Sequence, residues 1–150
     1  MPGADKKHID LGVLAGTIGF PLRLAQIALF RDFAVELARL NVTPAVFSAL
    51  EVLHRNPGMT QTRLAATIRL DRSSVVPLLD KLEKRGAVTR EASKTDRRRN
   101  HIHLTAQGEA LLAKAAERVL AHDRRMSERL AAKERRALVE LLWKFVRAAG

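Results

Sequence analysis

The chain lacks cysteine and tyrosine, holds a single tryptophan, and is only 4% aromatic over its 150 residues. Without cysteine, disulfides, thiolate metal sites and thiol-based redox sensing are excluded. The scarcity of aromatic side chains argues against binding by stacking on unpaired bases. No apolar run approaches the roughly 20 residues that a bilayer-spanning helix needs, and the first residues lack the long apolar stretch of a signal peptide. We therefore expect a cytoplasmic chain without a membrane anchor.

Positive charge is what the sequence has in excess. Lysine and arginine total 27 against 16 acidic residues, which gives a formal charge of +11 and a sequence pI near 11.2. Hydrophobic residues make up 47%, a normal proportion for a globular protein. The length suits one domain over residues 1–150. A folded domain this basic favours a polyanion as partner, either nucleic acid or an anionic membrane.

The first half of the chain shows helical periodicity. Apolar residues recur at helical spacing over residues 21–40, after a shorter helical piece at 9–18. Thr43 and Pro44 form the cap and first position of the next helix, which stops at residues 56–58.

Two short helices follow, and the spacing of the apolar residues then changes from helical to every second residue. Thr60 caps the first, and either Asp71 or Ser73 caps the second, which ends at Gly86. Residues 87–91 and 101–105 alternate as strands around a basic loop. Helices over residues 106–122 and 133–147 complete a fold that is mainly α with a small β-hairpin.

The two short helices have the layout of a helix-turn-helix, whose second helix points its N-terminus into the major groove. That end carries Arg72, Ser73 and Ser74. Arginine can bind both acceptors of guanine, and serine can bond to several bases. Simple capping is the alternative role for the two serines. Thr60 and Gln61, which begin the first of these helices, are further candidates for DNA contact.

The hairpin loop gathers four cations around one carboxylate. A narrow minor groove attracts an inserted arginine, and a carboxylate among arginines can pair with one of them and aim it. A solvated charged loop is the alternative. The candidate DNA-binding residues in this loop are Lys94, Asp96, Arg97, Arg98 and Arg99.

These motifs resemble the MarR family. The match runs through Leu64-Ala65, the helix at residues 71–82, the block at 82–88, Asp96-Arg97-Arg98, and the block at 104–108. The resemblance implies a winged helix-turn-helix over residues 43–105 and dimerisation helices at 10–42 and 106–150. It implies a homodimer on a palindromic operator, usually a repressor released by a small ligand. In that pattern Arg98 is the minor-groove residue at the wing tip, with Asp96 as its orienting partner.

Two residues depart from the family pattern. Arg69 stands where relatives often have glycine, so a left-handed backbone there would cost about 1 kcal/mol unless its side chain reaches a phosphate. Pro77 lies inside the recognition helix, cannot donate the helical hydrogen bond, and should kink the helix unless the helix starts as late as Ser74. Pro77 therefore puts any transfer of an operator sequence from relatives in doubt.

The resemblance also implies an effector cleft between the dimerisation helices and the DNA-binding lobe. Its occupant would be an aromatic acid or its coenzyme A thioester. An arginine could bind the carboxylate of such a ligand, and phenylalanines could cover its ring. The alternative is that the phenylalanines belong to the hydrophobic core and that the histidine only lies at a helix end. The candidate effector residues are Phe20, Arg23, Phe30, Phe47 and His54.

Three rival functions follow from the same sequence. An enzyme lacks support, because no phosphate-binding glycine loop, His-Glu-x-x-His or nucleophile elbow occurs. His101 and His103 could share a strand face as metal ligands, but no third ligand is evident. We expect no cofactor and no metal. A sequence-indifferent architectural DNA-binding protein is the stronger rival, and a membrane-surface helix is the weakest.

Overall fold

The computed structural model of the chain describes residues 9–92 and 100–149. In the described part, helices dominate and one small sheet is present. The elements in chain order are η1 (Gly12–Gly16), α1 (Gly19–Ala38), α2 (Pro44–Arg55), β1 (Met59–Thr60), α3 (Gln61–Thr67), α4 (Arg72–Lys84), β2 (Val88–Ala92), β3 (Asn100–Leu104), α5 (Ala106–Met126) and α6 (Ala132–Ala148).

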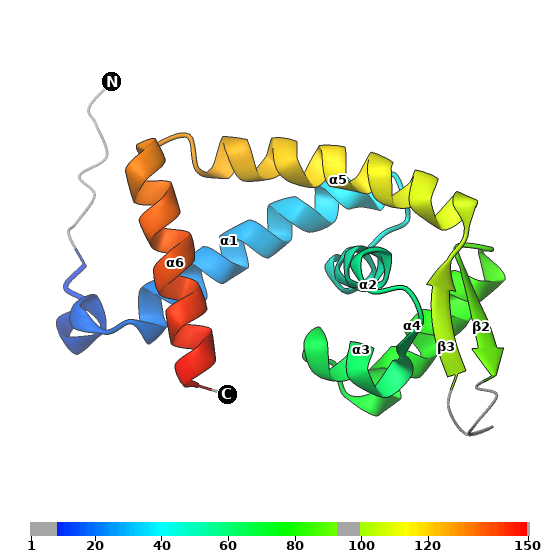
Figure 1. Cartoon of the computed structure of the whole chain (residues 1–150). Helices are drawn as coiled ribbons and strands as arrows, with labels where there is room; N and C mark the ends of the chain where they lie inside the picture. Colours follow the sequence, from blue (N-terminus) through cyan, green and yellow to red (C-terminus); the bar gives the residue numbers. More distant parts are fainter. Residues whose placement is uncertain (1–8, 93–99, 150) are drawn as a thin grey trace.

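The elements form a compact lobe joined to an extended helical arm (Figure 1). Helices α2, α3 and α4 and the sheet make up the lobe. Helix α5 leaves the lobe beside the sheet, runs along α1, and leads to α6 at the opposite end of the molecule. The mainly α fold with a small β wing is confirmed.

The lobe has its own hydrophobic core. Leu50, Leu64, Leu79 and Ile102, from four different elements, are fully buried within one cluster. Burial of side chains of this size contributes about 1.5–3 kcal/mol each. A smaller cluster around Leu37 joins α1 to α5. The lobe is thus held together independently of α6, which contributes no buried residue.

The sheet is antiparallel and has three strands in the order β1-β3-β2. Val88 pairs with Leu104 and Arg90 with Ile102, as a hairpin requires. The short strand β1 pairs Met59 with Ile102 on the other edge of β3, a strand that the periodicity did not predict. The sheet fixes the hairpin against the start of α3.

The predicted helix caps are confirmed where the structure describes them. The Thr43 hydroxyl accepts from the Val46 amide at 3.2 Å, and the Thr60 hydroxyl accepts from the Arg63 amide at 3.4 Å. Asp71, rather than Ser73, is the N-cap of α4. Helix α1 begins at Gly19, two residues earlier than the expected start at residue 21.

Both departures from the family pattern have a backbone consequence. Arg69 has a φ of 55°, so it occupies the left-handed region that favours glycine. Helix α4 starts at Arg72 and continues through Pro77 to Lys84. Because Pro77 has no N–H, the Ser73 carbonyl lacks its usual donor four residues along.

The arm exposes many large apolar side chains. Every residue of α6 is exposed, as are most residues of the first half of α1. Trp143 is 59% exposed and Leu141 62% exposed. Ile18 and Leu22 lie with Leu138 and Phe145 around an apolar hollow between the two helices. An apolar face this extensive on a single chain indicates an interaction surface.

Candidate nucleic-acid interface and cavity

The first turn of α4 is organised by one carboxylate. The Asp71 Oδ1 atom accepts from the Ser74 amide at 2.8 Å and from the Ser73 hydroxyl at 2.6 Å. Its Oδ2 atom accepts from the Ser74 hydroxyl at 3.2 Å. Asp71, Arg72, Ser73 and Ser74 are all exposed, so this turn faces solvent while Val75 and Leu79 anchor the helix in the core.

These bonds stabilise the ionised form of Asp71. The Ser73 hydroxyl contributes most, followed by the amide and hydroxyl of Ser74, and together they lower the pKa of Asp71 below its ordinary 3.8. Because the folded pKa is depressed, the contribution of the cap to stability is fully present above pH 3.8. It is lost as the pH falls through the lower folded value.

The remaining predicted DNA-binding residues fall into two groups. Thr60 and Gln61, both half-buried, begin α3, and the Thr60 hydroxyl is engaged as that helix's cap. Lys94, Asp96, Arg97, Arg98 and Arg99 lie outside the described residues. The strands that lead to them, β2 and β3, form the side of the lobe away from α6 (Figure 1).

Arg90 joins strand β2 to helix α4. From β2 its Nη2 atom donates to Asp80 Oδ1 at 2.6 Å, and its Nε atom lies 3.7 Å from Glu83 Oε2. The Arg90 side chain is only 18% exposed, so the attraction to these two residues of α4 is less screened by solvent than at an open surface. Sequence periodicity missed this residue, although its place in a strand next to an acidic helix face was a usable signal.

Arg85 joins the end of α4 to the end of α1. Its two terminal nitrogens donate to the carbonyl oxygens of Leu40 and Asn41 at 2.9 and 2.8 Å. Both carbonyls lie in the turn that follows α1, next to the C-terminus of that helix, where a cation is favoured. This contact connects the lobe directly to the arm.

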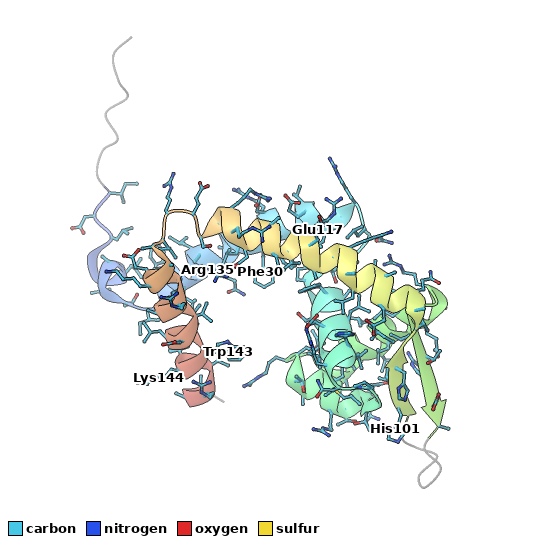
Figure 2. All side chains as sticks on the ribbon, turned by 45° about the horizontal axis from the view of Figure 1, so that its top comes forward. Phe30, His101, Glu117, Arg135, Trp143 and Lys144 are labelled. Carbon is cyan, nitrogen blue, oxygen red and sulfur yellow. The ribbon has the colours of Figure 1, made fainter. Side chains whose placement is uncertain are left out.

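A cavity of about 330 Å³ lies where α1, α2 and α5 meet. Its walls are mostly apolar, and the rings of Phe33 and Phe47 pack edge to face with centroids 6.3 Å apart. Phe30, which comes from α1, is labelled in Figure 2. The lining residues are Leu29, Phe30, Phe33, Pro44, Phe47, Ser48, Val119, His122 and Asp123.

His122 is the buried polar group of this cavity. It is 3% exposed and packs edge to face on Phe33 at 5.5 Å. Its Nε2 atom lies 3.3 Å from Asp32 Oδ2 but makes no hydrogen bond within the described part of the chain. Sequence reasoning missed His122. Its spacing of seven and three residues from Ala115 and Val119 places it on the inward stripe of α5 and could have revealed it.

The predicted effector residues are divided by the structure. Phe30 and Phe47 line the cavity. Phe20 lies half-buried in the first turn of α1 and Arg23 is exposed, both outside the lining. His54 instead pairs with Glu109, with Nδ1 2.7 Å from Oε2.

The described residues 9–92 and 100–149 contain no group of three or more His, Cys, Asp or Glu placed to hold a metal ion. The His101 ring, labelled in Figure 2, hydrogen-bonds through Nδ1 with the carbonyl oxygen of Gly58 at 2.8 Å. Within the same residues, no helix has both the length and the hydropathy to cross a bilayer.

Helices α3 and α4, joined by a tight turn and followed by the β2–β3 ribbon, define a winged helix-turn-helix protein. The model of the MarR family matches residues 40–99. A solved MarR-family protein of Mycobacterium tuberculosis is 32% identical over 86% of this chain and 96% of that chain, with a TM-score of 0.70. The chain therefore belongs to the MarR family, as its motifs predicted.

Two other relatives span nearly the whole chain. A protein of Thauera aromatica, described as a putative transcriptional regulatory protein for the hcr operon, is 41% identical over 96% of this chain and 87% of its own length. The transcriptional repressor CouR, solved bound to a 23-mer DNA duplex, is 38% identical over 93% of this chain and 99% of that chain, with a TM-score of 0.87. The chain is a transcriptional regulator of the MarR type.

Proposed function

We propose that this protein is a homodimeric repressor that binds a palindromic DNA operator and is released by a small aromatic acid or its coenzyme A thioester. In this proposal residues 43–105 read DNA. The segments at 10–42 and 106–150 form the dimer, and the cleft between the two parts receives the effector.

One observation carries the DNA-binding function. The winged helix-turn-helix superposes, with nearly the whole chain, on CouR in its complex with a 23-mer duplex. The exposed first turn of α4 offers Arg72, Ser73 and Ser74 at a helix N-terminus, where partial positive charge favours phosphates and base edges. The formal charge of +11 adds a sequence-independent attraction to the phosphate backbone.

The exposed apolar face of α1 and α6 supports the dimer. Leu138, Leu141, Trp143 and Phe145 lie on a helix with no buried residue, so the single chain leaves them in water. A second copy would bury this face in a two-fold arrangement, and two-fold proteins read two half-sites about one DNA turn apart.

Selection from a random duplex library tests the DNA-binding function. The dimer should enrich a palindrome whose half-sites are centred roughly 10 base pairs apart. Binding that enriches no sequence, with all duplexes bound equally at physiological salt, would contradict the proposal and favour an architectural DNA-binding protein.

The cavity supports the effector part of the proposal. Phe30, Phe33 and Phe47 offer an apolar enclosure of the size of small-ligand pockets. The buried Nε2 atom of His122, without a hydrogen bond in the described residues, offers one polar contact for a carboxylate or carbonyl oxygen. Two relatives were solved with ligands of this class, CouR with p-coumaroyl-CoA and the Mycobacterium tuberculosis protein with salicylic acid.

A release assay tests the effector. Salicylate and p-coumaroyl-CoA are titrated into the operator complex, with free coenzyme A as the control for its phosphates. We expect at least one of the two to release the DNA and the Phe30→Ala variant to need a higher concentration. Phe20→Ala, an aromatic change outside the cavity lining, should respond like the wild type. A complex unchanged by both compounds at millimolar concentration would count against this class of effector.

A further inference from the structure

The hydroxyl groups of Ser73 and Ser74 are oriented by one neighbour. Both donate to the carboxylate of Asp71, one to each oxygen, at 2.6 and 3.2 Å. The same carboxylate is held in place as the N-cap of α4 by the Ser74 amide at 2.8 Å. The three residues therefore form one small network at the tip of the helix.

The direction of these bonds follows from the charge of Asp71. An ionised carboxylate accepts hydrogen bonds and cannot donate them, and the network itself lowers the pKa of Asp71. Each serine hydroxyl has one proton, which the bond to Asp71 uses. What remains on each serine is the lone-pair capacity of its oxygen, which can accept.

We propose that Asp71 is a specificity-determining residue that makes Ser73 and Ser74 hydrogen-bond acceptors toward DNA. In the major groove, acceptors are complementary to the exocyclic amino groups of adenine and cytosine. They are not complementary to guanine O6 and N7 or to thymine O4, which are acceptors themselves. The serines thus select adenine or cytosine at the bases they touch. This inference rests on the proposed DNA-binding function.

The neighbouring side chains differ in chemistry. Arg72 carries donors alone and suits guanine, while the exposed Pro77 ring has no polar group. Without Asp71, a serine hydroxyl could either donate or accept and would distinguish bases poorly. The bonds to Asp71 therefore leave both serine hydroxyls able only to accept, and an acceptor prefers the amino group of adenine or cytosine.

The first test maps which operator positions depend on the serines. Duplexes selected by the wild type are compared with those selected by Ser73→Ala and Ser74→Ala. We expect one or two positions per half-site to lose their preference in a serine variant. Each base pair carries one adenine or cytosine, so these positions supply the candidate amino groups for the second test. Selections unchanged in both serine variants would overturn the inference.

The second test removes the amino group itself. At a serine-dependent adenine, substitution by purine, which lacks the 6-amino group, should weaken wild-type binding by roughly twofold to tenfold, the contribution of one hydrogen bond. The same substitution should have no further effect on the matching serine-to-alanine variant. Purine placed at an operator position independent of the serines controls for the altered base pair. Equal losses in wild type and variant would show that the serine does not accept from that amino group.

The third test changes the network while keeping the cap. Asparagine is as good an N-cap as aspartate, so Asp71→Asn should fold, which a thermal melt verifies. Its amide nitrogen is a donor, so at least one serine loses its proton acceptor and becomes free to donate. We expect guanine or thymine to be admitted at a serine-dependent position. An Asp71→Asn variant with the wild-type selection would overturn the inference, whereas a wild type that selects no sequence would overturn the proposed function itself.

Discussion

At Gly108, in the first turn of α5, the chain has no room for a side chain. A Cβ atom there would overlap the carbonyl oxygen of Ala87 and lie 3.2 Å from the Leu104 side chain. The Gly108 amide also donates to the Thr105 cap at 3.0 Å. The glycine thus allows α5 to begin directly beside the sheet.

We expect Gly108→Ala to destabilise the protein by about 1–3 kcal/mol or more, because backbone has to shift to relieve the overlap. Thermal or urea unfolding measures the change. Gly19→Ala is the matched control, since a Cβ at Gly19 meets nothing within 4 Å. Equal stability of Gly108→Ala and wild type would show that α5 does not approach the sheet this closely.

Arg69 is a second residue whose backbone conformation has a consequence. Its φ of 55° is unfavourable for a side chain with a Cβ. Arg69→Gly should therefore raise the free energy of unfolding by up to about 1 kcal/mol. If Arg69 also reaches a DNA phosphate, the same variant should weaken binding to all sequences alike and reduce its salt dependence by about one counterion. A loss of stability would contradict the proposed strain.

Among the elements, the wing carries half of the DNA-binding residues that were predicted from the sequence. Its tip residues lie outside the described residues, and Arg98 owes its assigned role to the MarR resemblance. We expect Arg98→Ala to weaken operator binding by about 1–3 kcal/mol. Lys114→Ala on α5, exposed and of equal charge change, is the control. Unchanged affinity of Arg98→Ala would refute the minor-groove role.

Most elements could be predicted from local signals, and the failures have physical reasons. The caps Thr43 and Thr60 were predictable because threonine directly before an apolar run of helical period is a preferred N-cap residue, whose hydroxyl accepts from a first-turn amide. Strand β1 was not, since two residues carry no period and owe their conformation to pairing with β3. The start of α1 was predicted at residue 21 rather than at Gly19, because glycine has a low helix propensity. Tertiary context can override such a propensity.

The candidate site was predictable to the same extent. Arg72, Ser73 and Ser74 follow from the helix-turn-helix pattern alone. The bonds that join both serines to Asp71, the Arg90 pair with α4 and the buried His122 all depend on side chains brought together in three dimensions. Helical spacing could have placed His122 on the inward face of α5, but spacing along the chain does not predict which side chains these residues contact.

At the scale of the whole molecule, the exposed apolar face of α1 and α6 predicts a homodimer. Light scattering should give twice the 16.7 kDa of one chain at micromolar concentration. Leu141→Glu places a charge on this face and should produce monomer, because an unpaired charge in an interface is costly. Thr62→Glu, exposed on α3 in the lobe, should remain dimeric. A wild-type mass near 16.7 kDa would contradict the dimer.

The whole molecule is also the scale at which sequence-specific regulation is tested. The most direct measurement is the ratio of dissociation constants for a selected operator and for random duplex of equal length, both at physiological salt. We expect the operator to be bound at least about a thousandfold more tightly. A ratio near one would show that the basic surface binds DNA without reading it, and would contradict the assignment of this chain as an operator-specific repressor.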